Sequence, residues 1–224
     1  MIALATPTDA ATPRRGAFMF ARLGSLLSVL PLSVWVVIHL WNNLAAFEGA
    51  EAWQRAVTQH PHPIAEILTF TIVLLPLLIH AAWGIGRLFS ARPNNHRYNL
   101  YGNFKYVLQR VTALGALAFL GAHLWLAFLK PRLLLGRPEA FSDIAHEMAT
   151  HPPTLIVYLL GTFGICFHLA NGLQTAAWQW GLVGSQKGIN RLDRAVLVFF
   201  ALLVIMSWAA IYALHSAGAA SASP

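Results

Sequence analysis

Charged side chains are scarce in this sequence. Only 10% of the 224 residues are Asp, Glu, Lys or Arg, whereas about a quarter of the residues in a soluble domain are charged. Hydrophobic residues account for 57% of the chain. A helix that crosses a bilayer needs roughly 20 consecutive, mostly apolar residues, and this composition can supply several. It therefore favours an integral membrane protein.

Cysteine is nearly absent too. Cys166 is the one cysteine, which excludes an intrachain disulfide, a Cys-x-x-Cys site for zinc or an iron–sulfur cluster, and Cys-x-x-Cys-His attachment of haem. No Gly-x-Gly-x-x-Gly motif opens a dinucleotide-binding fold. Any flavin or iron–sulfur cluster that works with this chain must therefore be bound by a partner.

Basic residues outnumber acidic ones by 15 to 8, but they form short clusters between apolar runs rather than one stripe. We therefore expect no nucleic-acid partner. Eleven of the Lys and Arg residues fall on one side of the predicted spans and four on the other. We expect a multi-pass protein of the bacterial cytoplasmic (inner) membrane, and the positive-inside rule predicts a cytoplasmic N-terminus and an external C-terminus.

The apolar residues gather in five segments, which predict an all-α fold, an integral membrane bundle of five transmembrane helices. None of the segments alternates with period two, so a β-barrel is disfavoured. We expect a disordered tail over residues 1–16, one membrane domain over 17–216 and a flexible tail over 217–224. Pro31 and Pro76 fall inside spans and predict kinks. The spans cover residues 22–46, 64–89, 106–130, 153–181 and 194–215.

Four of the ten histidines lie inside apolar segments, one in each of the first four: His39, His80, His123 and His168. Ionisable residues within a membrane usually face the bundle interior and mark functional sites. At a rise of about 1.5 Å per residue, His39 and His123 lie roughly 10–14 Å from the outer edge. By the same measure, His80 and His168 lie roughly 21–23 Å from it. The histidines therefore form an outer pair and an inner pair.

Two imidazoles from different helices at equal depth are the axial ligands that a haem between helices requires. The sequence therefore predicts two haems b between the first four helices, an outer one on His39 and His123 and an inner one on His80 and His168. Gly84 and Gly164 each share a face with an inner histidine and leave room for a ring edge. Zinc would need three or four converging ligands, and the depths bring at most two histidines together.

The chain also resembles the cytochrome b membrane-anchor subunit of the succinate dehydrogenase/fumarate reductase family, in its single-subunit, five-helix, di-haem form. The resemblance runs from about Phe20 to Tyr212. The motifs that carry it are Arg22-Leu23-x-Ser25-Leu26-Leu27, Val36-Val37-Ile38-His39-Leu40, Leu75-Pro76-Leu77-Leu78-Ile79-His80-Ala81-Ala82-Trp83-Gly84, Val107-Leu108-Gln109-Arg110-Val111-Thr112 and Phe167-His168-Leu169-Ala170-Asn171-Gly172-Leu173.

The resemblance implies that the four histidines match the family's axial ligands, in the pairs reached from depth. It implies that four polar residues lie near the inner haem: Arg22, Ser25, Gln109 and Arg110. It also implies flavoprotein and iron–sulfur partner subunits on the cytoplasmic face. Electrons from the iron–sulfur subunit would pass through the inner and then the outer haem to a quinone, which the stacked layout suggests is menaquinone.

Quinone reduction near the outer face needs a proton donor. Glu66 is the candidate catalytic acid, because it lies at the outer start of the second span and, by helical spacing, on the same face as His80. A solvated glutamate at a helix start is the alternative interpretation. Three functional alternatives stay open at this point. These are the quinol:fumarate reductase direction, a cytochrome b anchor of another respiratory dehydrogenase, and a transporter or plain anchor without haem.

Overall fold

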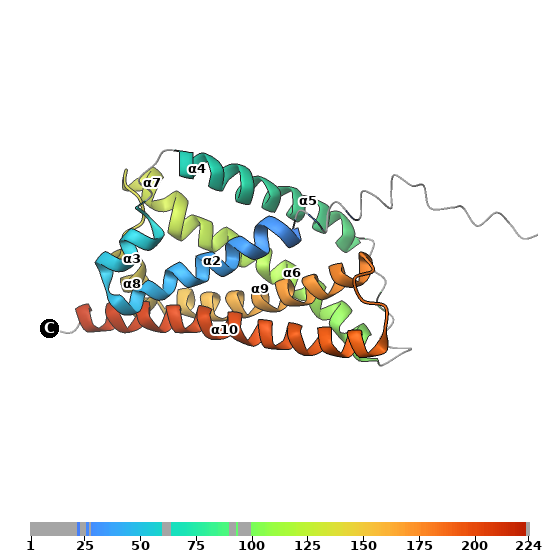
Figure 1. Ribbon diagram of the computed structural model, residues 1–224. Helices are drawn as coiled ribbons and strands as arrows, with labels where there is room; N and C mark the ends of the chain where they lie inside the picture. Colours follow the sequence, from blue (N-terminus) through green and yellow to red (C-terminus); the bar gives the residue numbers. More distant parts are fainter. Residues whose placement is uncertain are drawn as a thin grey trace, which may run out of the picture.

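The computed structural model describes Arg22, Leu26, residues 28–59 and 64–89, Pro93 and residues 100–222. The regular structure in these residues is helical throughout (Figure 1). Five helical segments within this part are long and apolar enough to cross a membrane, which confirms the predicted all-α membrane bundle. Their bounds are Leu30–Glu48, Ile67–Phe89, Tyr101–Leu134, Pro152–Gln179 and Gln186–Ser221.

The first three spans are built from several consecutive elements. The first comprises η1 (Ser28–Leu32), α2 (Ser33–Asn43) and η2 (Leu44–Glu48). The second comprises α4 (Ile64–Thr69), η3 (Phe70–Leu74) and α5 (Leu75–Phe89), and the third comprises α6 (Tyr101–Leu124), η4 (Trp125–Leu129) and α7 (Lys130–Leu134). The fourth and fifth are the continuous helices α9 (Pro152–Gln179) and α10 (Gln186–Ala222).

The interruptions η1, η3 and η4 are π-helical, and each lies beside a proline. Pro31 falls inside η1, Pro76 follows η3 and Pro131 follows η4. Proline has no N–H to donate and its ring clashes with the carbonyl four residues earlier. A wider i→i+5 turn relieves both problems. The predicted irregularities at Pro31 and Pro76 therefore take the form of π-helical turns.

Two short helices that hydropathy does not reveal, α3 (Ala50–Val57) and α8 (Phe141–Thr150), lie with α7 at one end of the bundle (Figure 1). We call this end the capped end. Trp53 of α3 and Phe141 of α8 meet there, with ring centroids 5.7 Å apart. Gln54 joins the two connections, because its amide donates to the Glu139 carbonyl at 2.9 Å and accepts from the Phe141 N–H at 3.1 Å.

The buried core is centred near the capped end, where α8 packs against α3, α9 and α10. Trp53, Ile144 and Met148 are bulky buried members of this core. Phe119 and Tyr158 extend it toward the middle of the bundle. The positions of Phe141, Ile144, Ala145 and Met148 follow helical spacing, so α8 presents one apolar face to this core.

Helix α10 extends well past the predicted span of residues 194–215, at both ends. Residues 217–222, which we expected to be a flexible tail, continue the helix instead. Gly218 explains the difference, because a side chain there would collide with the backbone of Ala145 in α8. The α10 end is thus packed against the cap. The predicted tail over residues 1–16 lies outside the described residues.

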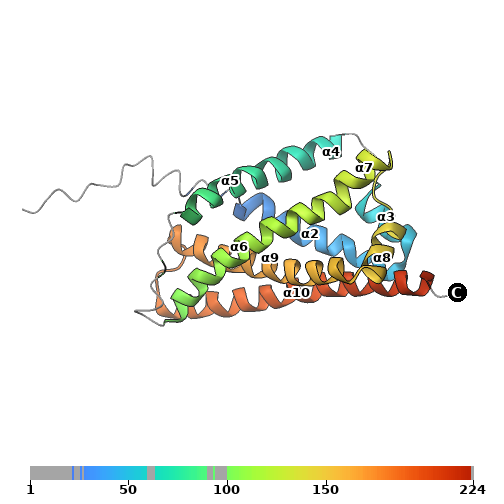
Figure 2. The same cartoon turned by 180° about the vertical axis from the view of Figure 1, so that it is seen from behind.

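Helices α4 and α5 lie on the opposite side of the bundle from α10, with α2, α6 and α9 between them (Figures 1 and 2). Helix α5 contacts the rest of the bundle mainly through η1 and α6. Many large apolar side chains on these helices are exposed, among them Leu78 at 61% and Leu160 at 68%. In a membrane such faces contact lipid, which solvates them.

Candidate functional site

The four intramembrane histidines lie in two pairs inside the bundle. The imidazole rings of His39 in α2 and His123 in α6 have centroids 5.8 Å apart and planes at 78°. The rings of His80 in α5 and His168 in α9 have centroids 6.3 Å apart and planes at 65°. Each pair joins two helices that are not neighbours in the chain. These are the two pairs that the depths of the residues suggested.

The spacing within each pair fits a metal ion held between two imidazoles. Two ring nitrogens that bind one metal from opposite sides, each at about 2 Å, place their ring centroids about 6 Å apart. Within the described residues no group of three or more His, Cys, Asp and Glu side chains converges on one point. The donor sets therefore suit a cofactor that supplies its own equatorial ligands, as haem does, rather than a zinc ion.

Small residues leave room beside the second pair. A Cβ atom built at Gly84 or at Gly164 would meet no atom within 4 Å. Each of these glycines lies one helical turn from its histidine, Gly84 from His80 and Gly164 from His168, and on the same face. A flat macrocycle between these histidines would pass such positions without a steric conflict.

His123 is held by a polar contact from the next span. Its Nδ1 lies 3.1 Å from the phenol oxygen of Tyr158 in α9. The ring of Phe119 stacks on that of His123, with centroids 5.6 Å apart and planes at 18°. Tyr158 and Phe119 are both buried, at 8% and 6% exposure. This leaves Nε2 of His123 as the nitrogen available to a metal.

His39 is fixed from its own helix and from the cap. Trp35 stacks on its ring with centroids 4.6 Å apart. The Asn43 amide donates to the backbone carbonyl of His39 at 2.8 Å and lies 3.4 Å from its Nε2. Trp53 of α3 donates to the amide oxygen of Asn43 at 3.1 Å. The capped end therefore reaches the first histidine pair through Asn43.

His168 is held by Gln109 of α6 in two ways. The Nδ1 of His168 lies 3.1 Å from the backbone carbonyl of Gln109, and the Gln109 amide donates to the backbone carbonyl of His168 at 3.0 Å. Asn171 donates to the amide oxygen of Gln109 at 2.8 Å. This contact brings Gln109, which the family resemblance placed near the inner pair, to the histidine itself. Nε2 of His168 remains for a metal.

The other polar residues named from the sequence lie at several places. Arg22 donates to the Gln179 carbonyl at 2.8 Å and its guanidinium lies 5.3 Å from the ring centroid of Trp180. Arg110 donates to the Tyr106 carbonyl at 2.8 Å and stacks on the Tyr106 ring. Ser25 lies outside the described residues.

Glu66 belongs to α4, but its side chain is also outside the described part. The π-helical stretch η3 lies between Glu66 and His80. Ideal α-helical spacing, from which we related these two positions, therefore does not hold along this segment.

A buried polar network on the His168 side of the bundle was not foreseen. Gln174 of α9 is fully buried and hydrogen-bonds on one side to the Lys105 ammonium of α6 and on the other to the Asp193 carboxylate of α10. Lys105 also lies 3.8 Å from Asp193. Three spans are thus tied together at one level. The sequence gave no sign of it, because Gln174 lies inside an apolar span and hydropathy does not show which way its side chain points.

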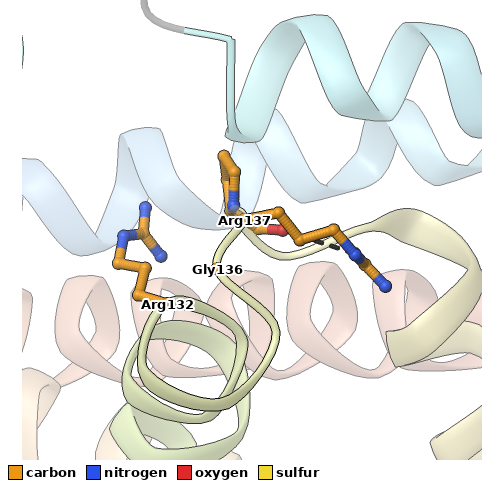
Figure 3. A pocket seen from close by; sticks show the side chains of 4 residues that line it. Arg132, Gly136 and Arg137 are labelled. Atoms are coloured by element: carbon orange, nitrogen blue, oxygen red, sulfur yellow. Dashed lines mark hydrogen bonds between the residues drawn. The ribbon is translucent and has the colours of Figure 1, made fainter.

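A surface hollow at the capped end is lined by Arg132, Gly136, Arg137 and Pro138, and its two arginines could attract an anion (Figure 3). Gly136 forms the turn with φ of +65°, a conformation that favours glycine. Arg132 pairs with Glu139 at 2.7 Å and Arg137 with Asp143 at 2.8 Å. Because each guanidinium already faces a carboxylate, the hollow is a structural turn of the cap.

Paired histidines inside a five-span helical bundle define a class of protein, the polytopic membrane proteins that present bis-imidazole sites. Comparison with known proteins then gives the family. Residues 90–207 match the family model of the succinate dehydrogenase/fumarate reductase transmembrane subunit. The chain belongs to this family and is one of its membrane subunits, as the sequence motifs had indicated.

Two curated proteins are similar to the chain. The succinate dehydrogenase cytochrome b558 subunit of Bacillus subtilis (strain 168) is 32% identical over 197 residues, which cover 88% of this chain and 96% of that protein. The succinate dehydrogenase hydrophobic membrane anchor subunit of Thermoplasma acidophilum is 29% identical over 105 residues, 47% of this chain and 80% of that protein.

Proposed function

We propose that this chain is the di-haem cytochrome b anchor of a succinate:quinone oxidoreductase. The observation that carries the proposal is the pair of crossed histidine contacts, at 5.8 and 6.3 Å, in a membrane subunit of this family. The name of the Bacillus subtilis relative, a cytochrome b558 subunit, agrees with haem b. His39 and His123 would hold one haem b and His80 and His168 the other.

Haem b in such a site supplies reversible one-electron oxidation and reduction, and two imidazoles leave the iron no open position for oxygen chemistry. The chain's own residues hold and orient the ligands. Tyr158 and Gln109 contact Nδ1 of His123 and His168, which fixes the ring orientations. The apolar helices exclude water from both pairs. Flavoprotein and iron–sulfur partners would deliver succinate's electrons at the cytoplasmic face, and the electron acceptor would be a low-potential quinone such as menaquinone.

The first experiment is haem b per chain, measured by pyridine haemochrome on detergent-purified protein, with a redox titration. We expect two haems with separable midpoint potentials. His123→Ala and His168→Ala should each lower the count to one. His146→Ala is the matched control, because His146 is exposed on α8, and it should retain both haems. A well-folded preparation without haem would refute the proposal and return the chain to the plain-anchor class.

Reduction of the haems by succinate in the complete complex separates this proposal from an anchor of another respiratory dehydrogenase. We expect succinate to reduce haem in the wild-type complex and malonate, a competitive dicarboxylate, to block the reduction. Haem that dithionite reduces but succinate does not would assign the chain to a different dehydrogenase.

We also propose Glu66 as the proton donor for quinone reduction at the outer face. It lies in α4, at the start of the second span. Glu66→Gln should lower quinone reductase activity and alter its pH profile while succinate still reduces the haems. Glu48→Gln is the control, because Glu48 is exposed at the end of the first span. Equal quinone reductase activities and equal pH profiles for the two variants would refute the proposed role of Glu66.

The proposed orientation places the capped end outside the cell. Cys166 is buried, so cysteines introduced at exposed positions can report on topology. Ser221→Cys at the capped end should react with a membrane-impermeant maleimide on intact cells, whereas Ser185→Cys should react only after lysis. The reverse labelling pattern would show that the topology is inverted, and it would not affect the assignment of the histidine pairs.

A further inference from the structure

The phenol of Tyr158 faces the first histidine pair from a third helix. Its oxygen lies 3.1 Å from Nδ1 of His123. The Tyr158 ring is edge-on to His123, with centroids 5.7 Å apart, and edge-on to Phe119, with centroids 5.2 Å apart. Tyr158 is 8% exposed, so water does not compete freely for its hydroxyl group. The contact therefore joins two buried polar groups in an apolar setting.

The two pairs differ in the group that faces Nδ1. At His168 it is the backbone carbonyl of Gln109, 3.1 Å away, which can only accept a hydrogen bond. At His123 it is a hydroxyl group, which is a weaker acceptor and can be removed by one substitution. A histidine that binds a metal through Nε2 carries its proton on Nδ1 and donates it to such a partner. The partner fixes the ring and makes the imidazole a stronger donor to the metal.

We propose that Tyr158 is a positioning residue that fixes the His123 ring and sets the reduction potential of the haem held by His39 and His123. The inference rests on the proposed di-haem function. Hydrogen bonds to an axial ligand are among the means by which a protein tunes haem potential. The hydroxyl group of Tyr158 accepts from Nδ1–H and thereby favours the oxidised iron. Loss of this hydroxyl group removes that effect at one haem only.

The test is Tyr158→Phe in the complete, haem-loaded complex, because this change removes the hydroxyl group and keeps the ring that packs on Phe119. Potentiometric titration of both haems and electron paramagnetic resonance of the oxidised protein are the readouts. We expect the midpoint potential of the His39–His123 haem to rise and its low-spin signal to change. The His80–His168 haem should be unchanged and serves as an internal reference.

Tyr212→Phe is the matched control, since Tyr212 is 66% exposed on α10 and its loss of a hydroxyl group should move neither haem. Phe119→Leu changes the packing around His123 and keeps the hydrogen bond. Loss of one haem in Tyr158→Phe but not in Phe119→Leu would also support the positioning role. Loss in both variants would overturn it, because packing would then hold the ring.

Unchanged potentials and signals in Tyr158→Phe, or equal shifts at both haems, would likewise overturn the inference. Either result can be told from failure of the proposed function. If the proposed function fails, the haem count per chain will be the same in the wild-type protein and in the His39→Ala variant. If the wild-type protein holds two haems and the His39→Ala variant holds one, the proposed function stands. The Tyr158→Phe result then tests the hydrogen bond alone.

Discussion

Replacing Gly161 with alanine adds one methyl group at the contact between α9 and α6. A Cβ atom there would lie 2.7 Å from the Cβ atom of Phe119 and closer still to two atoms of its ring. Carbon atoms pack comfortably at about 3.5–4.0 Å. Rotation of the Phe119 side chain cannot relieve the Cβ contact, so α6 and α9 must separate by about 1 Å.

Overpacking of this kind costs about 1–3 kcal/mol, and we expect the upper end because both partners are tied to helix backbones. A loss of about 3 kcal/mol corresponds to a fall in Tm of roughly 6–12 °C for a chain of this size. Phe119 stacks on His123. In the proposed di-haem protein, the His39–His123 site should therefore lose its haem on heating before the His80–His168 site does.

Thermal unfolding in detergent, followed by circular dichroism and by the haem absorbance, measures both effects. Gly121→Ala is the control, because Gly121 is exposed on α6 and a Cβ atom there meets nothing within 4 Å. In the double variant Gly161→Ala/Phe119→Ala, the cost should be less than the sum of the single costs, since the ring is gone. A Tm for Gly161→Ala equal to that of Gly121→Ala would refute the reasoning.

Three further outcomes follow from the polar contacts. Gln174→Leu should leave Lys105 and Asp193 without their shared partner and cost about 1–3 kcal/mol, measured as a lower Tm, whereas an unchanged Tm would mean that water replaces the amide. Gln54→Leu should loosen the connection between α3 and α8 and speed limited proteolysis near residues 137–140, and equal cleavage rates would contradict this. Arg55→Ala breaks an exposed ion pair and should change stability by less than about 1 kcal/mol, so a larger loss would show that the pair is stronger than its exposure implies.

The helical bundle and the positions of the histidines could be predicted because both leave strong marks on the sequence. Apolar runs of spanning length identify the helices. One histidine within each of four runs stands out against that background. Depth alone then separated His39 and His123 from His80 and His168, because a regular helix converts residue count into distance.

Rotation of the helices about their axes could not be predicted. Lipid and protein interior are both apolar, so hydropathy does not show which face of α9 points inward. Tyr158 and Gln174 consequently gave no sign that they contact His123 and Lys105. The π-helical turn η3 adds to this difficulty, since it breaks the spacing on which the relation of Glu66 to His80 depended.

The cap and the helix ends were missed for a different reason. A hydropathy window detects stretches of about 20 residues, whereas α3 and α8 are short and amphipathic. The signal of α8 is the helical spacing of Phe141, Ile144 and Met148. The extension of α10 to Ala222 depends on Gly218 fitting against α8, a tertiary contact that a composition of Ala and Ser does not reveal.

The crossed order of the two histidine pairs also affects how the chain would behave if it were cut. His39 joins His123, and His80 joins His168, so the two connections interleave along the chain. With a metal at each pair, any single backbone cleavage between His39 and His168 leaves both fragments linked through at least one iron. Two consecutive connections, His39 with His80 and His123 with His168, would not give this protection, because a cut between His80 and His123 would cross neither of them. Coexpressed halves of this protein, divided at the turn around Gly136, should therefore assemble into one haem-linked bundle.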